Sequence, residues 1–258
     1  MLNRRRKPTR RKPTGPGRML PYFCGVFLLL AVGIANLPAL PGSSADATSG
    51  VGVARAATGE LLLPEPATTG ELSVEEAIAR RRSVRSFSDR GIALTDLSQL
   101  LWAAQGVTGP EGFKRAAPSA GAKYPLEVFV AVGDVEGLDP GLYRYLPGTH
   151  ALLSAGGEDV RERLCGEALY QEWIEDAPVV LIVTAVYERT MAKYGERGVR
   201  YVHIEVGAVS ENVYLEAESL GLGTTFVGAF SDAGVKEILG TEDAEPLGIL
   251  PIGVPSGS

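Results

Sequence analysis

Cysteine and histidine are scarce in this sequence, which has two of each among its 258 residues. Cys24 lies in an apolar N-terminal stretch, so Cys165 is the only cysteine in the rest of the chain. This pattern excludes a disulfide framework. His150 and His203 together with one cysteine are too few ligands for a His- and Cys-rich metal site. We therefore expect neither a disulfide scaffold nor a metal centre.

Positive charge is scarce outside the N-terminus. The chain has 25 Lys and Arg against 31 Asp and Glu, and eight of the basic residues but no acid lie in residues 1–18. The remainder therefore carries 17 basic against 31 acidic residues, a net charge of −14. A nucleic-acid partner needs a positive surface, so this class of function is disfavoured. The composition, 45% hydrophobic and 22% charged, is that of a folded globular protein.

Residues 1–42 have the pattern of an export signal or a membrane anchor. The basic cluster precedes an uncharged stretch from Met19 to Ala45 with an apolar centre. Small residues after it suit cleavage of a signal peptide, but the apolar run is also close to the roughly 20 residues that span a bilayer. The Lys/Arg bias places the body outside the cytoplasm, secreted or anchored to the membrane by this segment. Residues 43–70 predict a flexible linker, and residues 71–258 the folded domain.

Helix and strand patterns alternate along the body. Ser73 and Glu76 form a capping-box pattern that predicts a helix to about Arg82. Valines at steps of three and four predict a long helix over 200–220, with Glu205 among the acids on its polar side. The other predicted helices are 95–105, 158–175 and 232–239, and the predicted strands are 126–132, 142–146, 179–183, 226–230 and 247–254.

Four segments carry residues suited to chemistry, and each has a plainer explanation. Residues 81–85 hold three arginines, whose guanidiniums match phosphate, but a basic helix end gives the same pattern. The small residues of 118–125 allow backbone to approach a planar ligand, or form a tight turn. Residues 221–230 lack the ending of a phosphate loop, and a glycine helix cap explains only Gly221. Residues 193–201 contain acid/base candidates, or form a polar loop before a helix.

In this order and spacing the segments resemble the FMN-dependent nitroreductase superfamily. They are most similar to its SagB-type branch, the azoline dehydrogenases of thiazole/oxazole-modified peptide pathways. The resemblance covers about residues 71–255. It implies an α+β three-layer sandwich with a central, mostly antiparallel sheet flanked by helices, and a homodimer with FMN at the subunit interface. The closest stretches are RRSVRSF at 81–87, PSAGAKYPLEVFV at 118–130 and KYGERGVRYVHIEVGAVSENVYLEAESLGLGTTFVGAF at 193–230.

The resemblance also implies roles for individual residues. The arginine cluster would hold the flavin phosphate, ribityl chain and pyrimidine edge, and two small-residue segments would approach the ring. Lys193 and Tyr194 match a Lys-Tyr pair linked to proton removal in azoline-oxidising members. No Lys or Arg follows Lys236, so phosphate binding would rely on the arginine cluster. The implied cofactor-binding residues are Arg81, Arg82, Ser83, Arg85, Pro118, Ser119, Ala120, Gly121, Val227, Gly228 and Ala229.

The resulting expectation is an FMN-dependent oxidoreductase that passes a hydride to or from flavin N5. Its substrate would be a small organic or quinone-like molecule, with NAD(P)H as one candidate electron donor. Two alternatives stay open. One is an azoline-to-azole dehydrogenase acting on a modified peptide, which the Lys-Tyr pair favours. The other is a non-catalytic flavin-binding module at the cell envelope.

Overall fold

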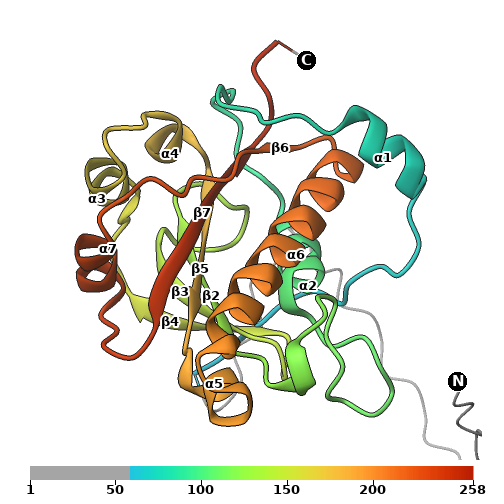
Figure 1. Cartoon of the computed structure of the whole chain (residues 1–258). Helices are drawn as coiled ribbons and strands as arrows, with labels where there is room; N and C mark the ends of the chain where they lie inside the picture. Colours follow the sequence, from blue (N-terminus) through green and yellow to red (C-terminus); the bar gives the residue numbers. More distant parts are fainter. Residues whose placement is uncertain (1–58, 258) are drawn as a thin grey trace, which may run out of the picture. The chain divides into compact units, whose positions relative to one another are not determined.

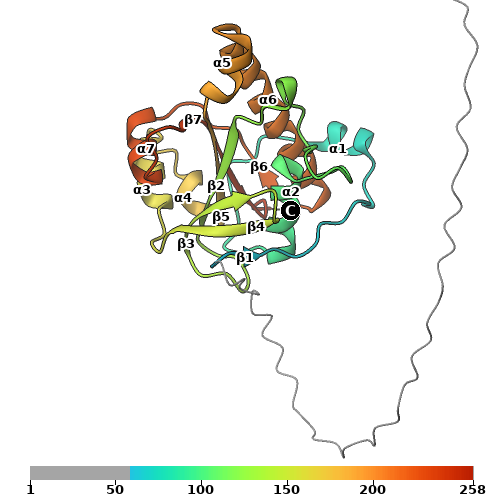
Figure 2. The ribbon, with the colours of Figure 1, turned by 90° about the horizontal axis from the view of Figure 1, so that it is seen from below.

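One antiparallel sheet organises residues 59–257, the part of the chain that this computed structural model describes. Its strands lie in the order β1-β4-β3-β2-β5-β7-β6, and helices cover it (Figures 1 and 2). The strands are β1 (Leu61–Leu62), β2 (Leu126–Val132), β3 (Gly141–Leu146), β4 (Ala151–Gly156), β5 (Val179–Ala185), β6 (Gly223–Thr224) and β7 (Glu245–Gly253). The helices are α1 (Val74–Arg80), α2 (Leu94–Gln105), α3 (Arg161–Glu167), α4 (Trp173–Asp176), α5 (Glu188–Tyr194), α6 (Arg197–Ser219) and α7 (Asp232–Leu239). The predicted α+β fold is confirmed.

The two faces of the sheet bury two separate apolar clusters. Side chains alternate along a strand, so Val128 and Val130 of β2 join one cluster while Phe129 and Ala131 join the other. All seven residues of β5 are buried, as its continuous apolar run predicts. Helices α2 and α6 pack on the first face and α3, α4 and α7 on the second (Figure 1). The result is the predicted three-layer sandwich.

Helix α6 presents its valines to the sheet, as their spacing predicts. Val202, Val206, Val209 and Val213 are all buried in the first cluster. The start of α1 is also confirmed, because the side chains of Ser73 and Glu76 form a reciprocal capping box.

The predicted helix over 158–175 is wrong, because the chain breaks it into α3 and α4. Leu169 and Tyr170 have φ values of 60° and 56°, in the left-handed region that ends a helix. The amide of Tyr170 closes the end of α3 by donating to the carbonyl of Cys165. Glycine normally occupies such positions, and its absence here concealed the break. The predicted strand at 226–230 is also wrong: pairing there is limited to one bridge between Val227 and Ile249, and β6 lies just before it.

The folded body begins before Gly70, so the predicted linker over 43–70 ends too late. Leu61 and Leu62 form β1, which pairs with β4 at the edge of the sheet. A two-residue strand is too short to leave a periodic signal. The predicted export or anchor segment, residues 1–42, lies outside the described residues. Within residues 59–257 no helix combines the length and apolarity needed to cross a membrane.

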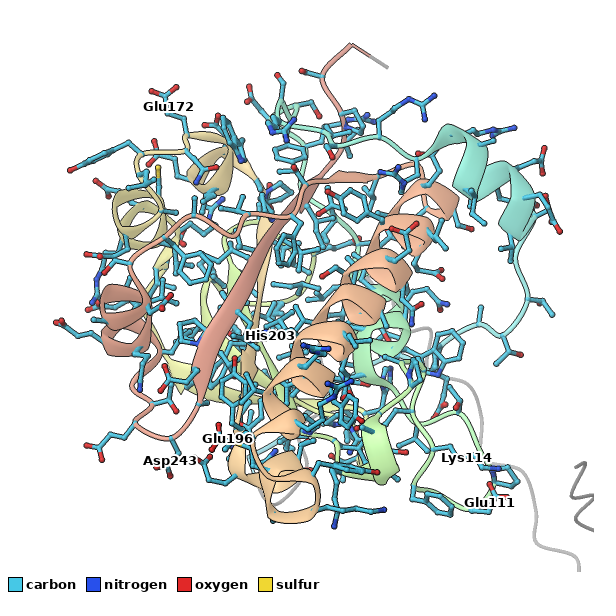
Figure 3. The ribbon with its side chains drawn as sticks, viewed as in Figure 1. Glu111, Lys114, Glu172, Glu196, His203 and Asp243 are labelled. Carbon is cyan, nitrogen blue, oxygen red and sulfur yellow. The ribbon has the colours of Figure 1, made fainter. Side chains whose placement is uncertain are left out.

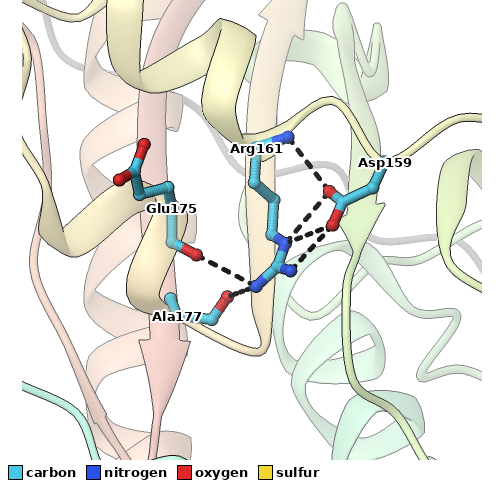
Figure 4. A network of polar contacts seen from close by, with 4 residues as sticks. All are labelled: Asp159, Arg161, Glu175 and Ala177. Carbon is cyan, nitrogen blue, oxygen red and sulfur yellow. Dashed lines mark hydrogen bonds and ion pairs between the residues drawn. The ribbon is translucent and has the colours of Figure 1, made fainter.

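Arg161 ties the start of α3 to the entry of β5 (Figure 4). Its guanidinium donates to both carboxylate oxygens of Asp159 and to the main-chain carbonyls of Glu175 and Ala177. Gly133 leaves the room for it, since a Cβ there would lie 1.9 Å from the guanidinium carbon. These contacts hold the loops at one end of the sheet.

Gly133→Ala is therefore expected to destabilise the fold by about 2 kcal/mol, a usual cost of overpacking. The guanidinium cannot swing away without losing its buried acceptors. Urea unfolding should show this loss, and the cost should shrink in an Arg161→Ala background because the clash is then gone. An equal cost in both backgrounds would contradict this account of Gly133.

Candidate functional site

The arginine segment lies against β6 and the end of β7. The amide of Val84 donates to the carbonyl of Thr224 at 2.9 Å, and the amide of Ser88 donates to the carbonyl of Val254 at 2.8 Å. A Cβ at Gly223 would lie 2.6 Å from a methyl carbon of Val84, so only glycine allows this approach. The fold thus brings together two of the four segments that the sequence singles out, 81–85 and 221–230.

Tyr214 of α6 joins these two segments, and no local sequence pattern singles it out. Its hydroxyl lies 3.2 Å from Ser83 Oγ and accepts a 2.8 Å hydrogen bond from the amide of Phe226. The guanidinium of Arg81 lies 5.3 Å from the centre of the Tyr214 ring, a cation–π arrangement. Arg81 Nε also lies 3.8 Å from Glu211 Oε1. We call Arg81, Ser83, Arg85, Tyr214 and Phe226 the arginine half of the site.

The arginines of the cluster differ in what they contact. Arg82 donates to the carbonyls of Ala79 and Arg81 at the end of α1, the role of a helix-end cation. Arg85 lies 5.8 Å from the ring centre of Trp173 and forms no ion pair with any residue in the described range. Arg85 is therefore available to an external anion, whereas Arg82 is occupied by the helix end.

The second pair of segments meets at Gly121. Its φ of 62° suits glycine, and a Cβ there would lie 2.7 Å from Tyr194 Oη and 2.9 Å from Lys193 Nζ. The two side chains at the end of α5 therefore converge over the turn formed by Ala120–Ala122. Tyr194 also packs edge-to-face on Tyr201, with ring centres 5.1 Å apart. We call residues 118–122, Lys193 and Tyr194 the Lys-Tyr half of the site.

In the segment 227–229, mainly backbone atoms are available to contact a ligand. Val227 is buried in the second apolar cluster, so its side chain faces the core. Gly228 and Ala229 are exposed, and the Ala229 carbonyl accepts a hydrogen bond from Gln171.

Glu205 is buried beneath the Lys-Tyr half, and its assignment to the polar side of α6 was wrong. It is 2% exposed, and its Oε1 has no hydrogen-bond partner among residues 59–257. Burial raises the pKa of its carboxyl to about 7, against the opposing influence of Ser119, Gln105 and the Arg115 charge. Its spacing from Val202 and Val209, three and four residues, places it within the apolar stripe, and this signal could have revealed its burial.

Neither histidine belongs to either half. His150 is part of a network with Ser98 and Tyr145, and burial lowers its pKa. His203 lies on the outward side of α6 (Figure 3), where Nε2 contacts the Tyr187 hydroxyl at 2.6 Å. Both have structural partners.

The two halves lie toward opposite ends of α6. Tyr201 contacts the Lys-Tyr half and Tyr214 the arginine half, and these residues are separated by about 20 Å at 1.5 Å per residue. Two cavities among the described residues contain no residue of either half. One, of about 810 Å³, lies between residues 65–74, α1, α2 and α6, and the other, of about 200 Å³, lies beside Arg115.

Comparison with known proteins places this arrangement in a family. The model of the Nitroreductase family matches residues 78–254, which is more than half of the chain. The chain belongs to the nitroreductase family. It is 48% identical over 196 residues to MJ1384 of Methanocaldococcus jannaschii, described as a nitroreductase, covering 76% of this chain and 96% of that protein.

Other relatives of this chain include a peptide-processing protein. The microcin B17-processing protein McbC of Escherichia coli is 26% identical over 162 residues, covering 60% of this chain and 59% of McbC. Among solved structures, one described as a nitroreductase of Ralstonia eutropha JMP134 superposes with a TM-score of 0.68 at 30% identity, covering 80% of this chain and 95% of that one. The McbBCD complex of E. coli shares the fold, with a TM-score of 0.61 at 24% identity and coverage of 75% and 76%.

Proposed function

We propose that this nitroreductase is an FMN-dependent oxidoreductase that exchanges a hydride with a small organic or quinone-like substrate. The observation that carries the proposal is the convergence of Lys193 Nζ and Tyr194 Oη over the small-residue turn at Gly121. It gives a planar ligand exposed backbone to lie against, with two proton-carrying groups at its edge.

The residues present fit FMN. Arg85 is an exposed guanidinium without an ion pair in the described range, Arg81 is only loosely paired with Glu211, and the Ser83 hydroxyl lies between them in sequence. Guanidiniums and a hydroxyl are suitable donors for a phosphate and for the carbonyls of a flavin ring. The exposed backbone of Gly228 and Ala229 adds a second surface without bulky side chains.

A homodimer would complete the site. The two halves are separated along α6, so the halves of one chain do not enclose a single ligand. In an antiparallel pair of α6 helices related by a two-fold axis, the arginine half of one chain would face the Lys-Tyr half of its partner. The exposed face of α6 carries Ile204, which is 63% exposed, followed by Gly207 and Ala208, and such small residues permit close helix approach.

The roles of the protein groups follow from this placement. A bound flavin supplies two-electron hydride transfer, the chemistry that side chains lack. Arg81 and Arg85 would hold anionic groups and stabilise negative charge on the ring. Lys193 Nζ or Tyr194 Oη would donate a proton to the substrate or accept one from it. Their closeness to Gly121 keeps both at the same edge of the proposed ring site.

The location and the electron donor are also proposals. The basic and apolar pattern of residues 1–42 supports export or anchoring, with the body outside the cytoplasm. NAD(P)H serves as the electron donor if the folded domain is in a compartment that contains nicotinamide nucleotides. In a compartment without them, a quinone or another protein serves as the donor. A second candidate function, oxidation of an azoline in a modified peptide, is supported by the relation to McbC and by the Lys-Tyr pair.

An absorption spectrum of the purified full-length protein tests the cofactor. We expect flavin bands that belong to FMN, identified by mass after release, and bleaching on anaerobic reduction by dithionite or NAD(P)H. Arg81→Ala/Arg85→Ala should lose the bands, while Arg163→Ala, an exposed arginine on α3, should keep them. Protein that binds no flavin even when FMN is supplied would overturn the proposal. Bound flavin that exchanges electrons with no acceptor would instead indicate the non-catalytic module.

Gly121→Ala is expected to lower turnover about tenfold with a smaller effect on flavin content, since precise placement of an acid/base group carries such factors. A Cβ at this position displaces both Tyr194 Oη and Lys193 Nζ, and the positive φ adds about 1 kcal/mol of strain. Steady-state reduction of a quinone with NAD(P)H measures turnover. Gly148→Ala is the control because a Cβ there meets no atom within 4 Å. Equal turnover in both variants would contradict the role of the Lys-Tyr half.

A further inference from the structure

A small arginine-lined cavity contains no residue of either half of the site, although Tyr124 in its wall donates its amide to Ser119 Oγ of the Lys-Tyr half. Its volume is about 200 Å³, and it lies between the end of α2, strands β2 and β3, and α5. Arg115, Arg144 and Arg189 line it, and Glu127 is the only acidic residue in its wall. None of the residues proposed to contact FMN belongs to it.

The side chains that line this cavity carry more positive than negative charge. Glu127 pairs through Oε1 with Arg189 at 2.5 Å and through Oε2 with Arg144 at 3.7 Å. Arg115 forms no ion pair in the part of the chain that the structure describes; it donates through Nη1 to the Gln105 carbonyl at 3.2 Å. The lining alone, three guanidiniums and one carboxylate, carries a net charge of +2, although the chain after residue 18 carries −14. Glu205, which is outside this lining, is the other acid that acts on the Arg115 charge.

Arg115 is the member of the cluster that most needs a partner. Its Nε is buried and has no hydrogen-bond acceptor among residues 59–257. The guanidinium lies over the Tyr124 ring, 5.0 Å from the ring centre, in a cation–π arrangement. Burial lowers its pKa, because removing the charged form from water is unfavourable. Unpaired donors on a half-buried cation are destabilising unless an anion completes them.

We propose that this cavity binds the carboxylate or phosphate group of a small molecule. Planar guanidiniums pair with both kinds of oxyanion through two parallel hydrogen bonds, and three of them around a small volume favour one such group. The cavity has room for the anion and a short attached chain. Arg189 precedes Lys193 by four residues on α5, so the bound anion would contact the helix that carries the Lys-Tyr pair.

Isothermal titration calorimetry tests the proposal on the full-length protein saturated with FMN, so that a flavin phosphate site is already filled. The probes are inorganic phosphate and malonate, at low ionic strength because salt screens such contacts. We expect saturable binding of at least one probe. Arg115→Gln and Arg144→Gln should each weaken it about tenfold or more, as for loss of a charge-assisted hydrogen bond. Arg163→Gln, an exposed arginine on α3, should leave it unchanged.

The outcomes separate the two ligand classes and test the site itself. Tighter binding of phosphate supports a phosphate-bearing ligand, and tighter binding of malonate supports a carboxylate. Absence of saturable binding up to about 10 mM, or equal affinity in the wild type and Arg144→Gln, would overturn the proposal. Arg144 has a 41% exposed side chain, so its variant should fold even if Arg115→Gln does not. A flavin spectrum unchanged in Arg144→Gln keeps this result independent of the proposed function.

Discussion

Two flavin-free variants of this nitroreductase-family protein are expected to regain flavin when they are co-expressed. Arg81→Ala/Arg85→Ala removes the anion-binding groups of the arginine half, and Ala120→Leu blocks the close backbone approach in the Lys-Tyr half. Each charge-assisted hydrogen bond contributes about 1.5–3 kcal/mol, so the double arginine variant should bind FMN about 10² to 10⁴ times more weakly. The two variants remove opposite halves of the same proposed site.

Complementation follows from the position of the halves on α6. In a mixed dimer one site receives both altered halves and the other receives both intact halves, because each site takes one half from each chain. Random pairing makes about half of the dimers mixed, so about a quarter of the wild-type flavin content should return. The measurement is flavin absorbance per protein in the co-purified mixture, with circular dichroism of each single variant to show that it folds.

The same experiment distinguishes a site built within one chain. If all flavin contacts came from a single subunit, no mixed dimer would contain an intact site and the mixture would stay colourless. Gel filtration of the wild type supplies the control for dimer formation. A monomer that retains flavin would contradict the shared site.

The sequence predicts helices and strands correctly where a long periodic pattern or a specific capping motif marks them. The valine stripe of α6, the continuous apolar run of β5 and the capping box at Ser73 each depend on local spacing, and the structure confirms all three. Local patterns suffice there because the periodicity of a helix or strand fixes which side chains share a face.

The missed features depend on tertiary contacts that leave no local pattern. Strand β1 is two residues long and exists only because β4 offers it an edge. The break after α3 uses left-handed Leu169 and Tyr170 in place of glycine. Tyr214 gains its position from partners 131 and 12 residues away, Ser83 and Phe226. Long-range pairing of this kind cannot be inferred from spacing within one helix.

Glu205→Gln is expected to stabilise the protein at alkaline pH and to leave it nearly unchanged at acidic pH. The ordinary pKa of this carboxyl is 4.5, and burial raises it to about 7 in the fold. The folded state therefore binds this proton more tightly than the unfolded state does. The resulting stability is fully present below about pH 4.5 and is lost as the pH rises through about 7. Glutamine imitates the uncharged form at every pH.

The difference in free energy of unfolding between Glu205→Gln and the wild type should thus grow across this window. A shift from 4.5 to about 7 corresponds to a difference on the order of 3 kcal/mol above pH 8. Urea titrations at intervals from pH 5 to pH 8.5 measure it. Glu237→Gln, an exposed acid on α7, should run parallel to the wild type throughout. Parallel curves for Glu205→Gln as well would contradict this account, because they would mean that the carboxyl beneath Ser119 is solvated in the native protein.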